Sequence, residues 1–242
     1  MRQFKAKHGQ SGALPDDERV FREDELEALS ARLSREGHLS LEATGSLAIG
    51  VASLLAGLHA TGMVHRRLRA SSVKVLRNDG DACVTVVELA PPTALAPSEP
   101  LPASAASLAY LSPESLLGFT PDPRVDLWAL GVLLYRCAYG RLPFRATTPE
   151  ELHRALERPV AVPATFSAET DLLLTGFFDR AFAHRSAVRF QSARTMGETF
   201  RALLEEAERI SEDESPLAFH AGRPLGSLAT IIPISMAARA RS

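Results

Sequence analysis

The sequence predicts a mainly α (α+β) fold: a helical bundle around one buried central helix, with a short β-hairpin. Residues 126–140 are apolar on nearly every side, which is typical of a helix enclosed on all faces. Residues 72–76 and 83–89 are short β-branched runs separated by a segment of turn composition. The chain of 242 residues is 45% hydrophobic and 23% charged, an ordinary composition for a soluble globular protein.

Composition divides the chain into three segments. Residues 1–23 combine glycine, proline and charged residues and predict a flexible lead-in. Residues 24–209 carry the helical periodicity and form the predicted domain. Residues 210–242 begin with an acidic run and predict a linker followed by a weakly ordered tail.

The first part of the domain predicts two helices. One begins at Asp24 and is closed by Gly37, and its apolar face consists of Leu26, Leu29 and Leu33. The other follows Ser40 and ends at Gly62. Its apolar face consists of Leu47, Val51, Leu54, Leu55 and Leu58.

After the hairpin, the sequence predicts a loop and then further helices. Residues 90–109 are rich in proline, alanine and serine and predict a long loop. The buried central helix follows that loop. Thr148 and Pro149 open a capping box, which predicts a short helix to about Glu157. Two more helices are predicted, near residues 168–182 and 192–209.

Charge and cysteine content narrow the class of protein. A net charge of −2 gives no electrostatic basis for binding nucleic acid or an anionic membrane. Cys83 and Cys137, the only cysteines, make neither a disulfide framework nor a zinc site and predict a reduced, cytoplasmic location. Residues 47–64 carry no formal charge over nearly the length of a membrane span, but their small residues and His59 favour a buried helix.

Several short motifs follow one another along the domain. Residues 65–72 read His-Arg-Arg-Leu-Arg-Ala-Ser-Ser, and Glu88-Leu89-Ala90 follows a short strand. Ser112-Pro113-Glu114 comes after the long loop. The buried helix begins with Asp126, Trp128 and Gly131, and Arg189 lies further along. Their order and spacing are those of H-R-D-L-x-x-x-N, D-F-G, A-P-E and D-x-W-x-x-G.

On these motifs, residues 24–209 resemble the larger, C-terminal helical lobe of a bacterial Ser/Thr protein kinase of the eukaryotic (Hanks) type. The resemblance implies an ion pair between Glu114 and Arg189 and a role for Asp126 in holding the backbone amides of the catalytic loop. It also implies that His65 packs within that loop. The tryptophan and glycine of the fourth motif, Trp128 and Gly131, belong to the same structural set.

The resemblance also assigns chemistry to positions at which this chain departs from the family. Arg67 stands in place of the aspartate that accepts the substrate hydroxyl, and a guanidinium has no acceptor to offer. Losing a general base commonly costs ~10²–10⁴ in rate. Ser72 replaces the asparagine that binds a second magnesium ion, and Glu88 replaces the metal-binding aspartate with a longer carboxylate. Arg69 keeps a positive charge that can touch a phosphate.

Arg66 leaves two interpretations open. It could dock a phosphorylated hydroxyl side chain, the candidates being Thr93, Ser98, Ser104 and Ser107. It could instead be a plain surface or interlobe arginine, because the loop has no catalytic aspartate for it to position.

In the family, a smaller lobe supplies a glycine-rich loop and a strand lysine for the nucleotide. Before Asp24 this chain has neither G-x-G-x-x-G nor V-A-I-K. We therefore expect no bound cofactor, and we expect ATP and magnesium only if a small lobe is supplied.

These features predict a pseudokinase, a catalytically inactive protein-binding or regulatory module of signalling. Its expected partner is a protein that covers the face left by the missing small lobe, with no nucleic acid and no membrane involved. One alternative is an active Ser/Thr protein kinase whose small lobe comes from another chain or from a start placed further upstream. The other alternative is a kinase fragment without function.

Overall fold

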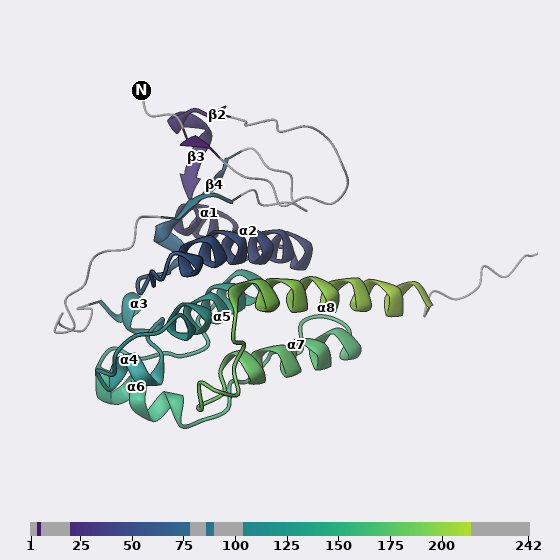
Figure 1. The fold of residues 1–242 in the computed structure, drawn as a ribbon. Coiled ribbons are helices and arrows are strands. Elements are labelled where there is room, and N and C mark those ends of the chain that lie inside the picture. The colour runs from purple at the N-terminus through teal and green to yellow at the C-terminus, as the bar shows by residue number, and fades with distance from the viewer. Residues whose placement is uncertain (1–3, 6–19, 78–85, 90–103, 214–242) are drawn as a thin grey trace, which may run out of the picture.

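A computed structural model describes residues 4–5, 20–77, 86–89 and 104–213 (Figure 1). Its four longest helices are α2 (Leu41–Ala60), α5 (Arg124–Tyr139), α7 (Ala168–Ala181) and α8 (Ala193–Asp213). α2 packs against α5 and α8, and α7 packs against the same two helices. A small antiparallel sheet lies above α2 in Figure 1. The described structure confirms the prediction of a mainly helical fold.

The sheet has three strands, in the order β3 (Leu26–Ala28), β4 (Val73–Leu76) and β5 (Val86–Leu89). In its register Leu26 pairs with Leu76, and Val73 pairs with Leu89. The predicted hairpin is therefore the second and third strand of a larger sheet. The connection between these two strands lies outside the described residues.

The prediction of a helix from Asp24 is wrong. η1 (Glu23–Glu25) and β3 come first, and α1 (Leu29–Glu36) begins only at Leu29. Leu26 fits the spacing of a helix and that of a strand alike. The strand forms because pairing with β4 provides hydrogen-bond partners for the backbone of β3. The buried Glu27 carboxylate also accepts two hydrogen bonds from Arg35 of α1, at 2.7 and 2.9 Å.

Short elements occur in ranges predicted to lack regular structure. β1 (Phe4–Lys5) and β2 (Val20–Phe21) pair within the predicted lead-in. α3 (Ala105–Leu108) lies within the predicted loop, whose residues 90–103 are outside the described part of the chain. α8 continues past residue 209 to Asp213, and the predicted tail after it is also outside that part.

Capping side chains start the helices where the sequence predicts. Ser40 caps α2, and the Thr148 hydroxyl accepts a hydrogen bond from the Glu151 N–H at 3.2 Å to begin α6 (Pro149–Leu156). The Glu151 carboxylate accepts from the Thr147 N–H at 2.8 Å. The reciprocal bond of the predicted capping box therefore closes one residue earlier than expected.

α5 is enclosed on all sides over most of its length. Every residue from Val125 to Tyr135 is buried. The Trp128 ring stacks on Phe144 with the centroids 5.4 Å apart. A Cβ atom at Gly131 would lie 3.1 Å from the Phe182 ring. A small residue at this position therefore allows the C-terminal end of α7 to pack closely against α5.

Among the described helices, α2 alone has the length and apolar composition needed to cross a membrane. Of its most apolar window, 44% is buried inside the protein. The helix packs against α5 and α8, as a core helix of a soluble protein does, and such a helix meets the same criterion. The observation is therefore weak support for a membrane span.

α2 and α8 approach closely at two glycines. A Cβ atom at Gly197 would lie 2.8 Å from the Cβ atom of Ala52, well inside van der Waals contact. A Cβ atom at Gly45 would collide with the Leu204 side chain. The contact between the two helices therefore depends on the absence of side chains at these positions.

Gly197→Leu is expected to lower the free energy of unfolding by about 1–3 kcal/mol, because the added side chain forces α2 and α8 apart. The matched control is Gly176→Leu on α7, where the residue is exposed and an added Cβ meets nothing within 4 Å. That control should leave stability unchanged or raise it by up to about 1 kcal/mol. Urea denaturation measures both changes, and equal effects of the two substitutions would contradict the close contact.

Candidate functional site

The residues of the first motif form a loop between α2 and β4. Gly62, with φ of +76°, turns the chain after the end of α2. The loop ends in η2 (Ala70–Ser72), which leads directly into β4. Along the loop His65 is buried, whereas Arg67 and Arg69 are exposed. The loop thus presents guanidinium groups to solvent and buries its histidine.

A buried carboxylate from the first turn of α5 holds this loop. Asp126 is 0% exposed, and its Oδ2 accepts a hydrogen bond from the His65 N–H at 2.7 Å. Its Oδ1 accepts from the Arg66 N–H, also at 2.7 Å. The His59 Nε2 at the end of α2 lies 2.8 Å from Oδ2. One side chain therefore joins α2, α5 and the loop.

Arg66 has a left-handed backbone with φ of +65°. This conformation costs an L-residue roughly 1–2 kcal/mol, so surrounding contacts must hold it in place. The hydrogen bond from the Arg66 N–H to Asp126 is such a contact. The side chain of Arg66 is half-buried. Its backbone is thus constrained by α5 whatever its side chain binds.

His65 and Arg67 are in contact within the loop. The His65 Nδ1 accepts a hydrogen bond from the Arg67 N–H at 3.3 Å, and the imidazole is 1% exposed. This places the histidine inside the loop, away from solvent. The exposed Arg67 guanidinium can donate hydrogen bonds and cannot accept a proton.

The Ser72 hydroxyl is used to close the turn of η2. Its Oγ accepts a hydrogen bond from the Arg69 N–H at 2.9 Å and donates one to the Arg69 carbonyl at 2.8 Å. The side chain is 8% exposed. The hydroxyl proton is therefore directed at the backbone, and one of the two lone pairs of the oxygen is used within the turn.

Glu88 lies in β5 and pairs across the sheet with Lys74 of β4. The Lys74 Nζ is 3.4 Å from the Glu88 Oε2, and both side chains are partly exposed. An ammonium at this distance competes with a metal ion for the carboxylate, because both are cations that bind the same oxygen. The Glu88 Oε2 makes no hydrogen bond within the described residues, so Lys74 acts on this carboxylate, the one that the sequence assigned to metal binding, through its charge.

Arg69 connects the loop to the segment around α3. Its Nη1 donates a hydrogen bond to the Ser107 Oγ at 2.7 Å. The Ser104 hydroxyl donates to the same Ser107 Oγ at 2.8 Å. Two serine hydroxyls from a segment more than thirty positions away in sequence thus lie beside the loop arginine.

A fourth arginine lies near the same segment. The Tyr110 side chain is 7% exposed, and in the described part of the chain its hydroxyl makes no well-aligned hydrogen bond. Burial raises the pKa of this hydroxyl, opposed by the Arg136 guanidinium of α5 and by the Ala70 backbone, which both lie close to it. Tyr110 therefore bridges the loop and the half-buried Arg136.

Glu114 and Arg189 form a bidentate ion pair. The two guanidinium nitrogens donate to the carboxylate oxygens at 2.7 and 2.9 Å, and the Arg189 Nε donates to the Ala183 carbonyl at 2.7 Å. The Arg189 guanidinium also lies over the Trp128 ring, 4.7 Å from its centroid. Arg189 is 1% exposed, so this pair ties α4 (Pro113–Leu116) to the core.

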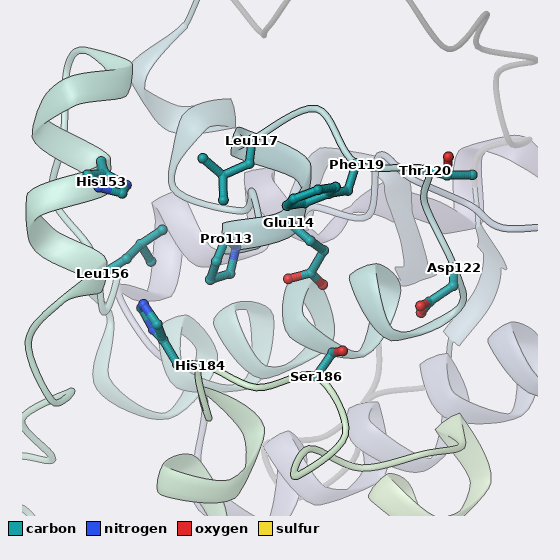
Figure 2. A pocket seen from close by; sticks show the side chains of 10 residues that line it. All are labelled: Pro113, Glu114, Leu117, Phe119, Thr120, Asp122, His153, Leu156, His184 and Ser186. Carbon is teal, nitrogen blue, oxygen red and sulfur yellow. The ribbon is translucent and has the colours of Figure 1, made fainter.

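A pocket of about 440 Å³ lies beside this ion pair (Figure 2). Figure 2 shows Leu117 and Phe119 above it and His153 and His184 at one side. Both apolar side chains are more than half exposed. The other lining residues are Pro113, Glu114, Thr120, Asp122, Leu156 and Ser186. The lining includes none of the loop arginines, so this pocket is separate from the loop.

The two candidate metal positions, Ser72 and Glu88, supply few oxygen donors for magnesium. Mg²⁺ needs near-octahedral oxygen geometry at short distance. The Ser72 oxygen already accepts one hydrogen bond within η2, and the Glu88 Oε2 lies 3.4 Å from the Lys74 ammonium without a hydrogen bond. In the described residues, no group of three or more His, Cys, Asp or Glu side chains is placed to hold a metal ion.

The structure adds contacts that sequence reasoning missed. These are the hydrogen bonds of His59 to Asp126 and of Arg69 to Ser107, the ion pair of Lys74 with Glu88, and the approach of Arg136 to Tyr110. In the last three contacts, the two residues come together only when the chain folds. For the pair in the sheet, the alternating burial of β4 gave a signal, because it directs Lys74 away from the core.

Comparison with known proteins gives a family match. The model of the protein kinase domain matches residues 19–200. The serine/threonine-protein kinase Pkn1 of Myxococcus xanthus is 30% identical over 180 residues, 72% of this chain and 26% of that protein. The serine/threonine-protein kinase PknL of Mycobacterium tuberculosis (strain CDC 1551 / Oshkosh) is 32% identical over 155 residues, 63% of this chain and 38% of that protein.

A mammalian relative gives a similar result. Sperm motility kinase 3A of Mus musculus is 29% identical over 150 residues, which are 61% of this chain and 29% of that protein. The chain thus spans well under half the length of each of these relatives.

The ion pair of Glu114 makes stability depend on pH. Burial alone would raise the pKa of Glu114, but hydrogen bonds from Arg189 and from the backbone hold it below its usual value. A lowered carboxyl pKa stabilises the folded state above the unfolded pKa, near 4.3 for glutamate, and that contribution is lost as the pH falls through the folded pKa. Glu114→Gln is therefore expected to lower the free energy of unfolding at pH 7 by about 2–4 kcal/mol.

The difference between wild type and Glu114→Gln should shrink as the pH is lowered from 7 to below about 4. Urea denaturation at several pH values measures it. The matched control is Glu205→Gln on α8, whose exposed pair with Arg201 should contribute less than about 1 kcal/mol. A difference in free energy of unfolding between wild type and Glu114→Gln that stays constant down to low pH would show that the ion pair does not contribute through the charge of the carboxylate.

Proposed function

The chain belongs to the protein kinase domain family, and from that premise we propose that it is a pseudokinase. In this proposal a kinase-like C-terminal helical lobe binds protein partners in the cytoplasm as a regulatory module and does not transfer phosphate. The observation that carries the proposal is the loop itself. Asp126 holds the loop by its backbone, while Arg67 occupies the place of the catalytic aspartate.

The chemistry of phosphoryl transfer supports this reading. The reaction needs a positioned nucleophile and neutralised phosphate charge, and it asks for little covalent work by the protein. A guanidinium at position 67 leaves the substrate hydroxyl without a proton acceptor. Lys74 places a positive charge 3.4 Å from the Glu88 carboxylate, and the Ser72 oxygen already accepts a hydrogen bond within η2, so both positions are weaker metal ligands than those of the kinase pattern. Both the proton acceptor and the metal ligands of the kinase pattern are therefore altered, in the same loop and its adjoining sheet.

The partner in this proposal is a protein that packs on the side of the lobe where the smaller lobe of a kinase lies. Exposed large hydrophobic side chains in the described residues are Met63, Leu117, Phe119, Leu172 and Val188. None of them belongs to β3, β4 or β5. A partner on the sheet side would therefore contact polar and half-buried side chains such as Lys74 and Glu88 in the described part of the chain.

The alternative function is that of an active Ser/Thr protein kinase. The names of the relatives Pkn1 and PknL favour it, because both are called serine/threonine-protein kinases. Glu88 also keeps a carboxylate at the position of the metal-binding aspartate. Catalysis by this chain would need the nucleotide-binding elements of a small lobe, from the same polypeptide or from another.

A thermal-shift titration of the purified protein with ATP, with and without magnesium or manganese, separates these functions. A ligand that binds only the folded state stabilises it by about 2.7 kcal/mol at a hundred times its Kd. The pseudokinase proposal predicts no metal-dependent change in Tm with ATP. A metal-dependent rise in Tm that disappears in Glu88→Gln and persists in Glu205→Gln would support a nucleotide site and overturn the proposal.

A further inference from the structure

We propose that the loop around Arg67 binds a phosphorylated serine or threonine of a partner protein. This inference rests on the proposed pseudokinase function and names the chemistry of its ligand. A kinase loop presents a carboxylate to a neutral hydroxyl, and a carboxylate repels a phosphate. Replacing it with a guanidinium removes the repulsion and adds a group that binds phosphate through paired N–H donors.

The charge of the loop favours an anionic ligand. Three of the four residues from Arg66 to Arg69 are arginines, and two of them, Arg67 and Arg69, are exposed. A phosphoserine carries a charge of about −1.5 to −2 at pH 7 and three acceptor oxygens. The protein as a whole has a net charge of −2, so the positive character of the loop is local and does not reflect a basic protein.

The loop is held in one conformation before any ligand binds. Asp126 accepts hydrogen bonds from the His65 and Arg66 amides, and the Ser72 hydroxyl closes the next turn at both Arg69 backbone groups. Fixing a flexible loop on binding costs free energy, and a preformed loop avoids that cost. The positions from which Arg67 and Arg69 extend are thus set by the fold.

Neighbouring donors extend the site toward α3 and α5. The bond to Ser107 uses one of the five N–H donors of Arg69 and fixes the direction of its guanidinium. Tyr110 is more than nine-tenths buried, and its hydroxyl lacks a well-aligned partner among the described residues. It lies against Ala70 of the loop and near Arg136 of α5. Because the Tyr110 hydroxyl is enclosed, an anion beside the loop would contact the exposed Arg67 and Arg69.

Fluorescence anisotropy of the full chain with three labelled peptides tests the proposal. The peptides consist of alanine and glycine around one central residue, which is phosphoserine, serine or glutamate. The phosphoserine peptide is expected to bind at least ten-fold more tightly than the serine peptide at about 150 mM salt, with the glutamate peptide between them. Inorganic phosphate should compete with the phosphoserine peptide.

Substitutions locate the site. Arg67→Asp and Arg69→Gln should each weaken binding of the phosphoserine peptide at least ten-fold. Arg67→Lys should weaken it less than Arg67→Asp, because the charge remains and the paired donors are lost. Arg201→Gln, an exposed arginine on α8, is the matched control and should leave binding unchanged. Circular dichroism and a thermal melt establish whether each variant is folded. If Arg67→Asp is not folded, Arg69→Gln still tests the proposal.

Equal binding of the phosphoserine and serine peptides would overturn the inference. So would phosphoserine binding that Arg67→Asp and Arg69→Gln leave intact, or that Arg201→Gln weakens equally. The pseudokinase proposal fails on a separate readout, the metal-dependent shift with ATP. A protein that shows neither a nucleotide shift nor phosphoserine selectivity would remain a candidate pseudokinase whose partner is recognised elsewhere.

Discussion

The carboxylate of Asp126 lies where α2, α5 and the loop after α2 meet. It accepts hydrogen bonds from two consecutive backbone amides, one of which belongs to a residue in the left-handed region, and it contacts His59 of α2. Without a buried acceptor, these amides would be unpaired in the interior, at a cost of about 1–3 kcal/mol each. The backbone of the loop at His65 and Arg66 therefore depends on this one residue, which contributes to the backbone of the site and not to its chemistry.

The contacts that shape the fold and the groups that would perform catalysis are separate in this protein. Asp126, the pair of Glu114 with Arg189, and Trp128 act through buried contacts that fix α4, α5 and the loop. The positions that would face a substrate or a metal carry Arg67, Ser72 and Glu88, and each of these differs from the kinase pattern. The family fold therefore does not establish the family activity here, because catalysis requires the groups at positions 67, 72 and 88.

Sequence reasoning predicted the parts of the fold that depend on local signals. The caps at Ser40 and Thr148 and the apolar run of α5 determine where those helices lie, and the structure agrees. β3 was missed because Leu26 fits either period and its partner strand lies about fifty positions away. The relation between the loop and Asp126 came from the family resemblance, since spacing alone does not bring residues sixty positions apart together. The contacts of Arg69 with Ser107 and of Arg136 with Tyr110 require the folded chain.

We propose that this kinase scaffold does not transfer phosphate. Incubation of the full chain with ATP labelled at the γ-phosphate, magnesium and a mixture of serine and threonine peptides tests it most directly. Labelling of the peptides and of the protein itself is expected not to exceed the labelling measured with the Glu88→Gln variant. This variant lacks the last carboxylate assigned to a metal. Labelling that exceeds this control and depends on magnesium would contradict the account, and it would mean that Arg67 does not prevent catalysis.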